Sequence, residues 1–168
     1  MTDTTNKRWA IIQDILTKEG IARQHLNSFD EFLRNGLQEI INEVSQIEIE
    51  NAEYPYKIQL GKIKHTQPRM MELDGSITHL TPAEARLRNV SYVAPLQLET
   101  SIIEDGKILE TKFIHIGDIP VMVKSDACIL RNFSEQKLIE HGEDPSDPAG
   151  YFIINGSERV IVGLEDLS

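Results

Sequence analysis

Length, composition and charge exclude several classes of protein. The chain has 168 residues, 40% hydrophobic and 26% charged, which is the composition of a globular domain rather than of a disordered chain. Its formal net charge of −10 disfavours an autonomous nucleic-acid binder, and its single cysteine excludes an internal disulfide. Because no run of about 18 apolar residues is present and the N-terminus is too polar for a secretory signal, we expect an intracellular, cytoplasmic protein without a membrane partner.

The N-terminal quarter of the sequence predicts two helices. Apolar residues recur at helical spacing over residues 9–19 and stop at Gly20, which predicts a first helix. Ser28 and Glu31 form a capping-box pattern. The apolar stripe that follows them predicts a second, longer helix through about Val44.

The middle of the chain has the alternating pattern of strands. Alternation from Tyr56 resumes after Gly61 in a shifted register, which predicts a strand with a β-bulge. Pro95 is expected to limit the start of the next strand. The turn residues 104–106 then predict a long hairpin, and residues 117–120 are expected to break its second strand.

Short helices and turns are predicted between the strands. One helix is capped by Thr81 and runs to about Asn89, and another is capped by Ser134 and runs to about His141. Asp74, followed by a glycine, marks a turn. The order predicts an α+β fold, in which N-terminal helices precede a mainly antiparallel sheet with short helical inserts.

The stretch GYFIINGSERVIV, residues 150–162, predicts the sharpest hairpin. Asn155 and Gly156 accept the positive φ angles of a two-residue type I′ turn, and the apolar runs on both sides have strand chemistry. Glu158 and Arg159 are neighbours on the return strand and should point to opposite faces, so we expect each to find its own partner. These four residues are assigned a structural role.

No motif in the sequence assembles a catalytic or metal site. The five histidines lack paired metal spacing, and neither a Walker-type phosphate loop nor a nucleophile elbow is present. Cys128 lies in an apolar stretch and is expected to be a buried small hydrophobe. Asp144 and Asp147 flank prolines and are expected to accept backbone hydrogen bonds.

The charges are unevenly distributed along the chain. Acidic residues crowd residues 39–53, whereas residues 54–71 and 85–98 contain cations and no acid. Cations of this kind contact nucleic-acid phosphates without reading bases, and a solvated surface is the alternative interpretation. The candidate nucleic-acid-binding residues are Lys62, Lys64, Arg69, Arg86 and Arg88.

Five segments of the chain are distinctive when they are taken together and in order. They are NSFDEFLRNGLQEII (27–41), IQLGKIKHTQP (58–68), DGSITHLTPAEARLRNVSY (74–92), IGDIPVMVKSDACIL (116–130) and DPAGYFIINGSERVIV (147–162). In this order they resemble the N-terminal part of the second-largest subunit of multisubunit RNA polymerases, called B in archaea and beta in bacteria. The compact spacing between Ile103 and Phe113 is similar to the archaeal form.

The resemblance implies a protrusion domain, a module that lines one side of the DNA cleft during transcription. Residues 1–25 would be an N-terminal helical segment and residues 26–168 the first part of the protrusion, without the lobe and later segments. The parent enzyme is a multisubunit, DNA-binding nucleotidyltransferase (a transferase), and this region of it is not catalytic. Mg²⁺ and Zn²⁺ are expected elsewhere in that enzyme, with no cofactor in this chain. The implied partners are other polymerase subunits, DNA in the cleft and general initiation factors, and the implied location is the archaeal nucleoid.

Two further expectations accompany the resemblance. A later family segment returns to the protrusion sheet, so its absence predicts an unpaired sheet edge and either reduced stability or self-association. The alternative function is a stand-alone protein-interaction module that binds polymerase subunits or initiation factors through the apolar face of the 29–44 helix. A small independent enzyme is a distant third.

Overall fold

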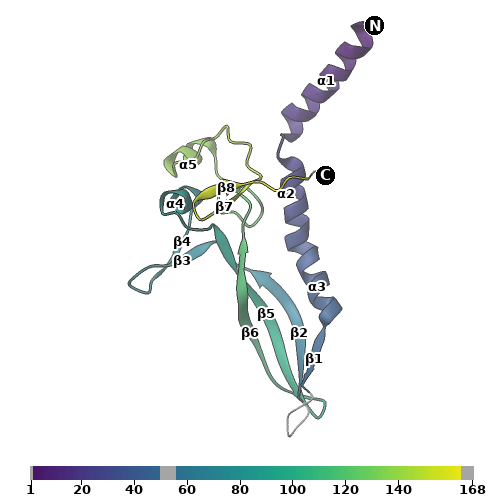
Figure 1. Ribbon diagram of the computed structural model, residues 1–168, viewed down its shortest axis with the longest axis vertical. Coiled ribbons are helices and arrows are strands. Elements are labelled where there is room, and N and C mark those ends of the chain that lie inside the picture. The colour runs from purple at the N-terminus through teal and green to yellow at the C-terminus, as the bar shows by residue number, and fades with distance from the viewer. Residues whose placement is uncertain (1, 50–55, 164–168) are drawn as a thin grey trace, which may run out of the picture.

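A computed structural model describes residues 2–49 and 56–163 (Figure 1). Glu50 and Glu53 of the acidic stretch, and the chain end at residues 164–168, lie outside the described residues. The predicted α+β class is confirmed: helices come first, followed by a mainly antiparallel sheet with short helices between its strands. Of the helices in the described part of the chain, none has the length and apolarity needed to cross a membrane.

The first helix ends where the sequence predicts. Helix α1 (Thr2–Glu19) stops before Gly20, whose φ of +76° suits a residue without a Cβ. The second helix then continues through three segments with helical dihedral angles at every junction. They are α2 (Arg23–Glu31), the π-helical turn η1 (Phe32–Gly36) and α3 (Leu37–Val44).

The predicted start of the second helix is wrong. Ser28 lies inside α2, which is preceded by Ala22 without any side-chain cap. Ala22 is buried against Gly150, where an added Cβ would come within 2.7 Å of the Ala22 Cβ. Tertiary packing of Ala22 on this glycine therefore fixes the helix start, and it overrides the local capping pattern.

A long four-stranded antiparallel sheet follows the helices, in the order β1-β2-β5-β6. Figure 1 shows it extending away from the end of the molecule where α4, α5, β7 and β8 gather. The predicted bulge is present in β2, between Leu60 and Ile63. The bounds are β1 (Gln46–Ile49), β2 (Tyr56–His65), β5 (Val93–Glu104) and β6 (Lys107–Pro120).

Two predicted strand limits are wrong. Strand β5 begins at Val93 and contains Pro95, and β6 continues through residues 117–120. The β5–β6 register shifts between Leu96 and Gln97, next to the proline. Pro95 itself pairs with Asp118, and its carbonyl accepts the Thr66 N–H at 3.2 Å just past the end of β2. The missing proline N–H therefore faces the end of β2, where the ladder stops, and does not end β5.

The shorter elements match the predicted caps and turns. Thr81 and Glu84 form a complete capping box at the start of α4 (Pro82–Leu87), and Ser134 accepts a hydrogen bond from the Lys137 N–H at the start of α5 (Glu135–Glu140). Asp74 stabilises the turn between two short strands by accepting the Ser76 N–H. The short strand pairs are β3 (Arg69–Met71) with β4 (Ile77–His79), and β7 (Phe152–Ile154) with β8 (Ser157–Arg159).

The hydrophobic core lies at one end of the long sheet, beneath the β7–β8 hairpin. Tyr92 is fully buried, and its N–H donates to the Ile153 carbonyl at 2.9 Å while its carbonyl accepts from Val121 at 2.9 Å. Val123 donates in turn to the Tyr151 carbonyl. These bonds fix the hairpin against the base of the sheet.

Candidate nucleic-acid interface

Arg86 is the centre of a polar cluster that joins α4 to the β7–β8 hairpin. Its Nε donates to Glu158 Oε1 at 2.8 Å, Nη1 donates to Glu143 Oε2 at 3.0 Å, and Nη2 donates to the Tyr151 hydroxyl at 2.7 Å. The Tyr151 hydroxyl itself donates to the Asp147 carboxylate. The Glu143 side chain is only 4% exposed, so its charge depends on Arg86 for compensation.

The surroundings of this cluster keep the arginine charged and the tyrosine neutral. Partial burial lowers the pKa of Arg86, but Tyr151 and Glu143 beside it raise the pKa by more, so the net change is upward. Burial, followed by the hydrogen bond to Asp147, raises the pKa of Tyr151. Arg86 is therefore a permanent cation whose charge is already balanced by two carboxylates of its own chain.

Arg88 also pairs within the chain. Its two terminal nitrogens donate to the two carboxylate oxygens of Glu72, each at 2.8 Å, and this bidentate pair links the end of α4 to the loop after β3. The hydrogen bonds from Arg88 and then Thr78 lower the pKa of Glu72. The hydrogen bond to Glu72 raises the pKa of Arg88.

Lys62 and Lys64 differ from the two arginines because both are exposed on β2. The Lys64 Nζ lies 3.6 Å from the centroid of the Phe113 ring on β6. Arg69 is half-buried at the start of β3. Among the described residues, no carboxylate forms an ion pair with Lys62, Lys64 or Arg69. A phosphate that binds these three cations would therefore not have to displace a carboxylate of the described chain.

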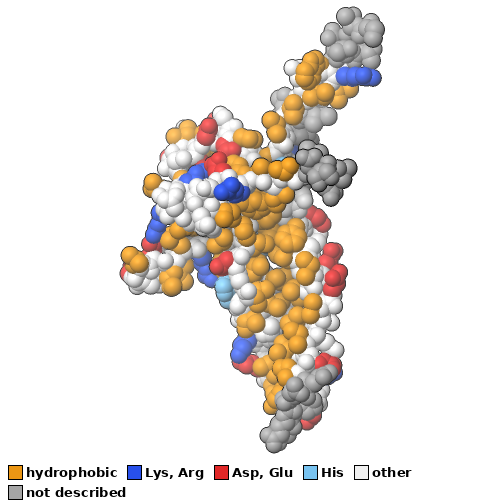
Figure 2. Space-filling model, in the orientation of Figure 1, with side chains coloured by type: hydrophobic (Ala, Val, Ile, Leu, Met, Phe, Trp, Pro, Cys, Tyr) orange, Lys and Arg blue, Asp and Glu red, His pale blue; other side chains and the backbone are white. Residues whose placement is uncertain are grey.

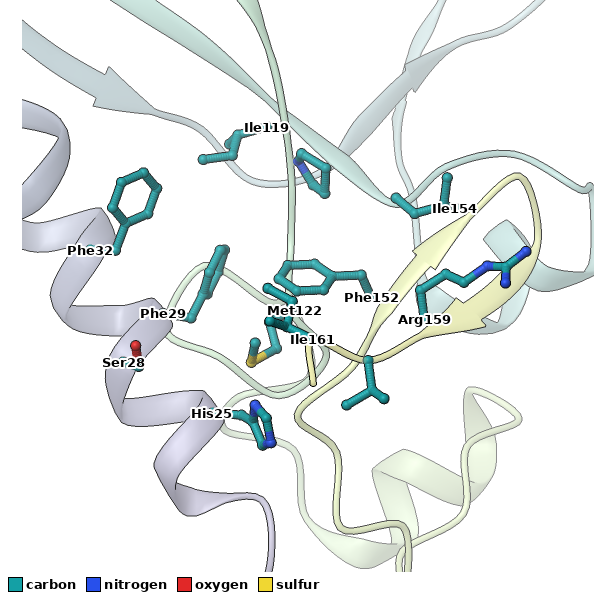
Figure 3. A pocket seen from close by; sticks show the side chains of 12 residues that line it. His25, Ser28, Phe29, Phe32, Ile119, Met122, Phe152, Ile154, Arg159 and Ile161 are labelled. Atoms are coloured by element: carbon teal, nitrogen blue, oxygen red, sulfur yellow. The ribbon is translucent and has the colours of Figure 1, made fainter. Parts of the chain in front are cut away.

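The hairpin residues have distinct contacts. Asn155 and Gly156 have φ angles of 49° and 75°, and the Gly156 N–H donates to the Val90 carbonyl at 3.0 Å. Glu158 binds Arg86, whereas Arg159 lines an apolar groove on another side of the hairpin (Figure 3). The hairpin thus lies between the polar cluster and the groove.

The groove opens between the second helix and the hairpin, with a volume of about 610 Å³. Figure 3 shows Phe29 and Phe32 of the helix facing Ile119 and Phe152 across it. The Phe29 and Phe152 rings meet edge to face, with centroids 5.4 Å apart. In Figure 2 the hydrophobic surface continues from this region along the long sheet, with charged side chains at its margins.

Cys128, Asp144 and Asp147 have the structural contacts that the sequence predicts. Cys128 is buried, and its Sγ accepts a hydrogen bond from the Tyr92 hydroxyl at 3.4 Å. Burial raises the pKa of this thiol. Asp144 and Asp147 accept backbone N–H groups at 2.8 Å, as expected of carboxylates in turns. Within residues 2–49 and 56–163, no three His, Cys, Asp or Glu side chains come together as a metal site requires.

The sequence did not identify the carboxylates that hold the two arginines. Glu143 is 57 residues from Arg86 along the chain, and Glu72 is 16 residues from Arg88. Both glutamates lie outside any periodic or motif pattern. The sequence indicates them only indirectly. Residues 85–98 contain both arginines and no acid, so any carboxylate that pairs with these arginines has to come from another part of the chain.

The fold and these contacts define an α+β module that presents exposed cations and an apolar groove. Residues 20–168 match the family described as RNA polymerase beta subunit, and the chain belongs to this family. It is 46% identical over 166 residues to DNA-directed RNA polymerase subunit Rpo2 of Saccharolobus solfataricus, and 48% identical over 166 residues to the protein of that name from Sulfolobus acidocaldarius. It is 43% identical over 165 residues to subunit Rpo2N of Halobacterium salinarum.

These alignments cover nearly all of this chain but a small part of the relatives. They include 98% of the chain and 14% of each of the two Rpo2 proteins, and 93% of the chain and 32% of Rpo2N. The three relatives are archaeal, and the assignment to the B or beta subunit family made from the sequence is confirmed.

Proposed function

We propose that this chain is the N-terminal part of the B subunit of an archaeal DNA-directed RNA polymerase, and that it lines the DNA cleft as the first part of the protrusion. The observation that carries the proposal is that 93–98% of this chain aligns, at 43–46% identity, with proteins named DNA-directed RNA polymerase subunits. In this proposal residues 26–168 form the protrusion and residues 1–25 lead into it. Nucleotidyl transfer belongs to the assembled enzyme.

The proposal includes partners that the chain needs for its function. These are the other polymerase subunits, DNA in the cleft and general initiation factors, while Mg²⁺ and Zn²⁺ are held elsewhere in the assembly. A cytoplasmic, nucleoid-associated location follows from this function. The names of the relatives support the polymerase function and give no support to a stand-alone interaction module.

The intrachain contacts rank the five candidate DNA-binding cations. Lys62 and Lys64 come first because they are exposed and form no ion pair with any described carboxylate. Arg69 comes second because it is half-buried. Arg86 and Arg88 come last because a phosphate would have to compete with Glu143, Glu158 or Glu72 for their guanidinium groups.

The test is charge reversal in a reconstituted polymerase that contains this chain. We expect the double variant K62E/K64E to weaken DNA binding and to reduce the dependence of binding on salt concentration. A protein that contacts fewer phosphates releases fewer counterions when it binds. The single variants K62E and K64E each have a matched control in K137E, which reverses one positive charge on α5. Binding and salt dependence equal to those of the wild type in K62E/K64E would contradict the phosphate-contact role.

The cleft-lining role and the stand-alone interaction module predict different results in this assay. Loss of DNA crosslinking with assembly intact supports a cleft-lining role. Loss of binding to a polymerase subunit or an initiation factor, with DNA crosslinking unchanged, supports the interaction module instead.

A further inference from the structure

Strand β6 is an open edge of the long sheet. It pairs with β5 on one side, and no other described strand pairs with it. Figure 1 shows β6 on the side of the sheet away from α2 and α3, so these helices do not cover it. Every residue from 107 to 116 is exposed. A long exposed edge of this kind presents unpaired N–H and C=O groups to any strand that can match it.

The sequence of this edge is self-complementary around Thr111. In the stretch ILETKFI, Glu110 precedes the threonine and Lys112 follows it. Beyond these charges, both flanks are apolar and exposed: Ile108 is 62% exposed on one side, and Phe113 is 44% exposed on the other. When the stretch is reversed about Thr111, Glu110 and Lys112 exchange places, and the apolar residues on one flank fall on those of the other.

Glu110 and Lys112 are available to a partner strand. They form an ion pair with each other at 3.2 Å within β6, and both side chains are 55% exposed. An exposed pair of this kind contributes little to stability, so exchanging it for pairs across an interface costs little.

We propose that two copies of this chain associate through β6, with the two strands antiparallel and Thr111 of each copy opposite Thr111 of the other. Glu110 of each copy then lies opposite Lys112 of the other, and the apolar flanks meet on both sides of the charges. Directly opposed side chains of opposite charge stabilise an antiparallel pair. The two four-stranded sheets become one continuous sheet, and both open β6 edges are paired.

The charges also select this register over its neighbours. A slip of one residue would place Lys112 opposite Thr111 and Glu110 opposite Phe113, which leaves both charges without partners at the interface. A slip of two residues in the direction that places Lys112 opposite Lys112 would oppose like charges, which is destabilising. The proposal does not depend on the polymerase function, because it concerns the free chain.

The first test is sedimentation velocity of the free chain over a series of concentrations. We expect a monomer–dimer equilibrium whose dissociation constant rises about tenfold in K112E, because two attractive pairs become two repulsive ones. The swapped variant E110K/K112E restores complementarity and should dimerise as the wild type does. K137E changes the net charge by the same amount on α5 and should have no comparable effect.

The second test maps the two-fold position by disulfide formation. In T111C the two cysteines would lie directly opposite each other, with Cα atoms about 5 Å apart, within the range of a disulfide. Ser101 lies opposite Thr111 on the inner strand β5, so two copies of S101C would be three strand spacings apart, about 14 Å. We expect T111C to form a covalent dimer under mild oxidation and S101C to remain monomeric. The native Cys128 is buried and does not interfere.

Three results in sedimentation would overturn the proposal. They are a monomeric wild-type chain at every concentration, association that K112E leaves unchanged, and failure of E110K/K112E to dimerise while its circular dichroism spectrum remains native. Crosslinking of S101C as fast as T111C would also overturn it, because it would place a different surface at the two-fold axis.

Discussion

The side-chain amide of Gln38 bridges the β-bulge at Gly61. Its Nε2 donates to the Gly61 carbonyl at 3.1 Å, and its Oε1 accepts the Ile63 N–H at 3.1 Å. The β2–β5 register shifts between Leu60 and Ile63, and the Gln38 amide of α3 supplies the hydrogen-bond partner for one backbone group on each side of Lys62. One glutamine therefore fixes the helix to the strand that carries Lys62 and Lys64.

Replacing Gln38 should destabilise the fold. We expect Q38A to lower the free energy of unfolding by about 1–3 kcal/mol, because two partly buried backbone groups lose their partner. Q38E keeps the acceptor for Ile63 and loses the donor to Gly61, so its loss should be intermediate. Urea denaturation monitored by circular dichroism measures both. The control Q67A changes an exposed glutamine between β2 and β3, and equal losses in Q38A and Q67A would contradict the bridging role.

Removing the Arg86 guanidinium should leave a buried charge without compensation. We expect R86M to lower the free energy of unfolding by about 3 kcal/mol, because the Glu143 side chain is 4% exposed and loses its counter-charge. E158Q should cost less than about 1 kcal/mol, since Glu158 is 55% exposed. Both values follow from equilibrium denaturation.

A double variant separates charge compensation from simple packing. R86M/E143Q removes the stranded charge together with its partner, so we expect it to recover a large share of the stability lost in R86M. If the double variant were less stable than R86M by the full cost of an independent mutation, the two residues would not be coupled.

The carboxylates with lowered pKa values make stability depend on pH. Hydrogen bonds from Arg88 and Arg34 lower the pKa values of Glu72 and Asp126. A carboxyl with a lower pKa in the folded chain stabilises the fold above its ordinary pKa of about 4, and this contribution is lost as the pH falls through the folded-state pKa. We therefore expect E72Q to be less stable than the wild type at neutral pH. The difference should narrow in denaturation curves as the pH falls toward about 3. A difference that widens on acidification would contradict the sign of the effect.

The two positive-φ glycines at Gly156 and Gly75 form a matched pair. Both have φ near +80°, but a Cβ at Gly156 would come 2.8 Å from the Asn89 Cα, whereas a Cβ at Gly75 would meet nothing within 4 Å. G75A should show only backbone strain of about 1 kcal/mol, and G156A should cost more because the hairpin must also move away from Asn89. Thermal denaturation compares them. Equal losses would mean that the hairpin does not pack against Asn89.

The sequence predicts this fold well wherever the determinant is local. The positive φ angle at Asn155, the turn at residues 104–106 and the helix cap at Thr81 depend on residues within a few positions, and the structure has each of them. The predicted start of the second helix was wrong because the packing of Ala22 on Gly150 determines where α2 begins, and these two residues are far apart in the chain.

The candidate site was less predictable than the fold for the same reason. Its cations are visible in two acid-free stretches, but their exposure depends on partners that only the tertiary structure brings close. Arg86 meets Glu143 through the loop that precedes β7, whereas Lys64 meets the Phe113 ring through the strand order of the sheet. No local pattern distinguishes these two cations.

Crosslinking from position 64 tests the central claim most directly. A photoreactive amino acid replaces Lys64 in a reconstituted polymerase bound to promoter DNA, and the crosslinked partner is identified by its label. The cleft-lining function predicts a crosslink to DNA that depends on assembly of the polymerase. Crosslinks to protein subunits alone, in a polymerase that binds promoter DNA normally, would contradict it.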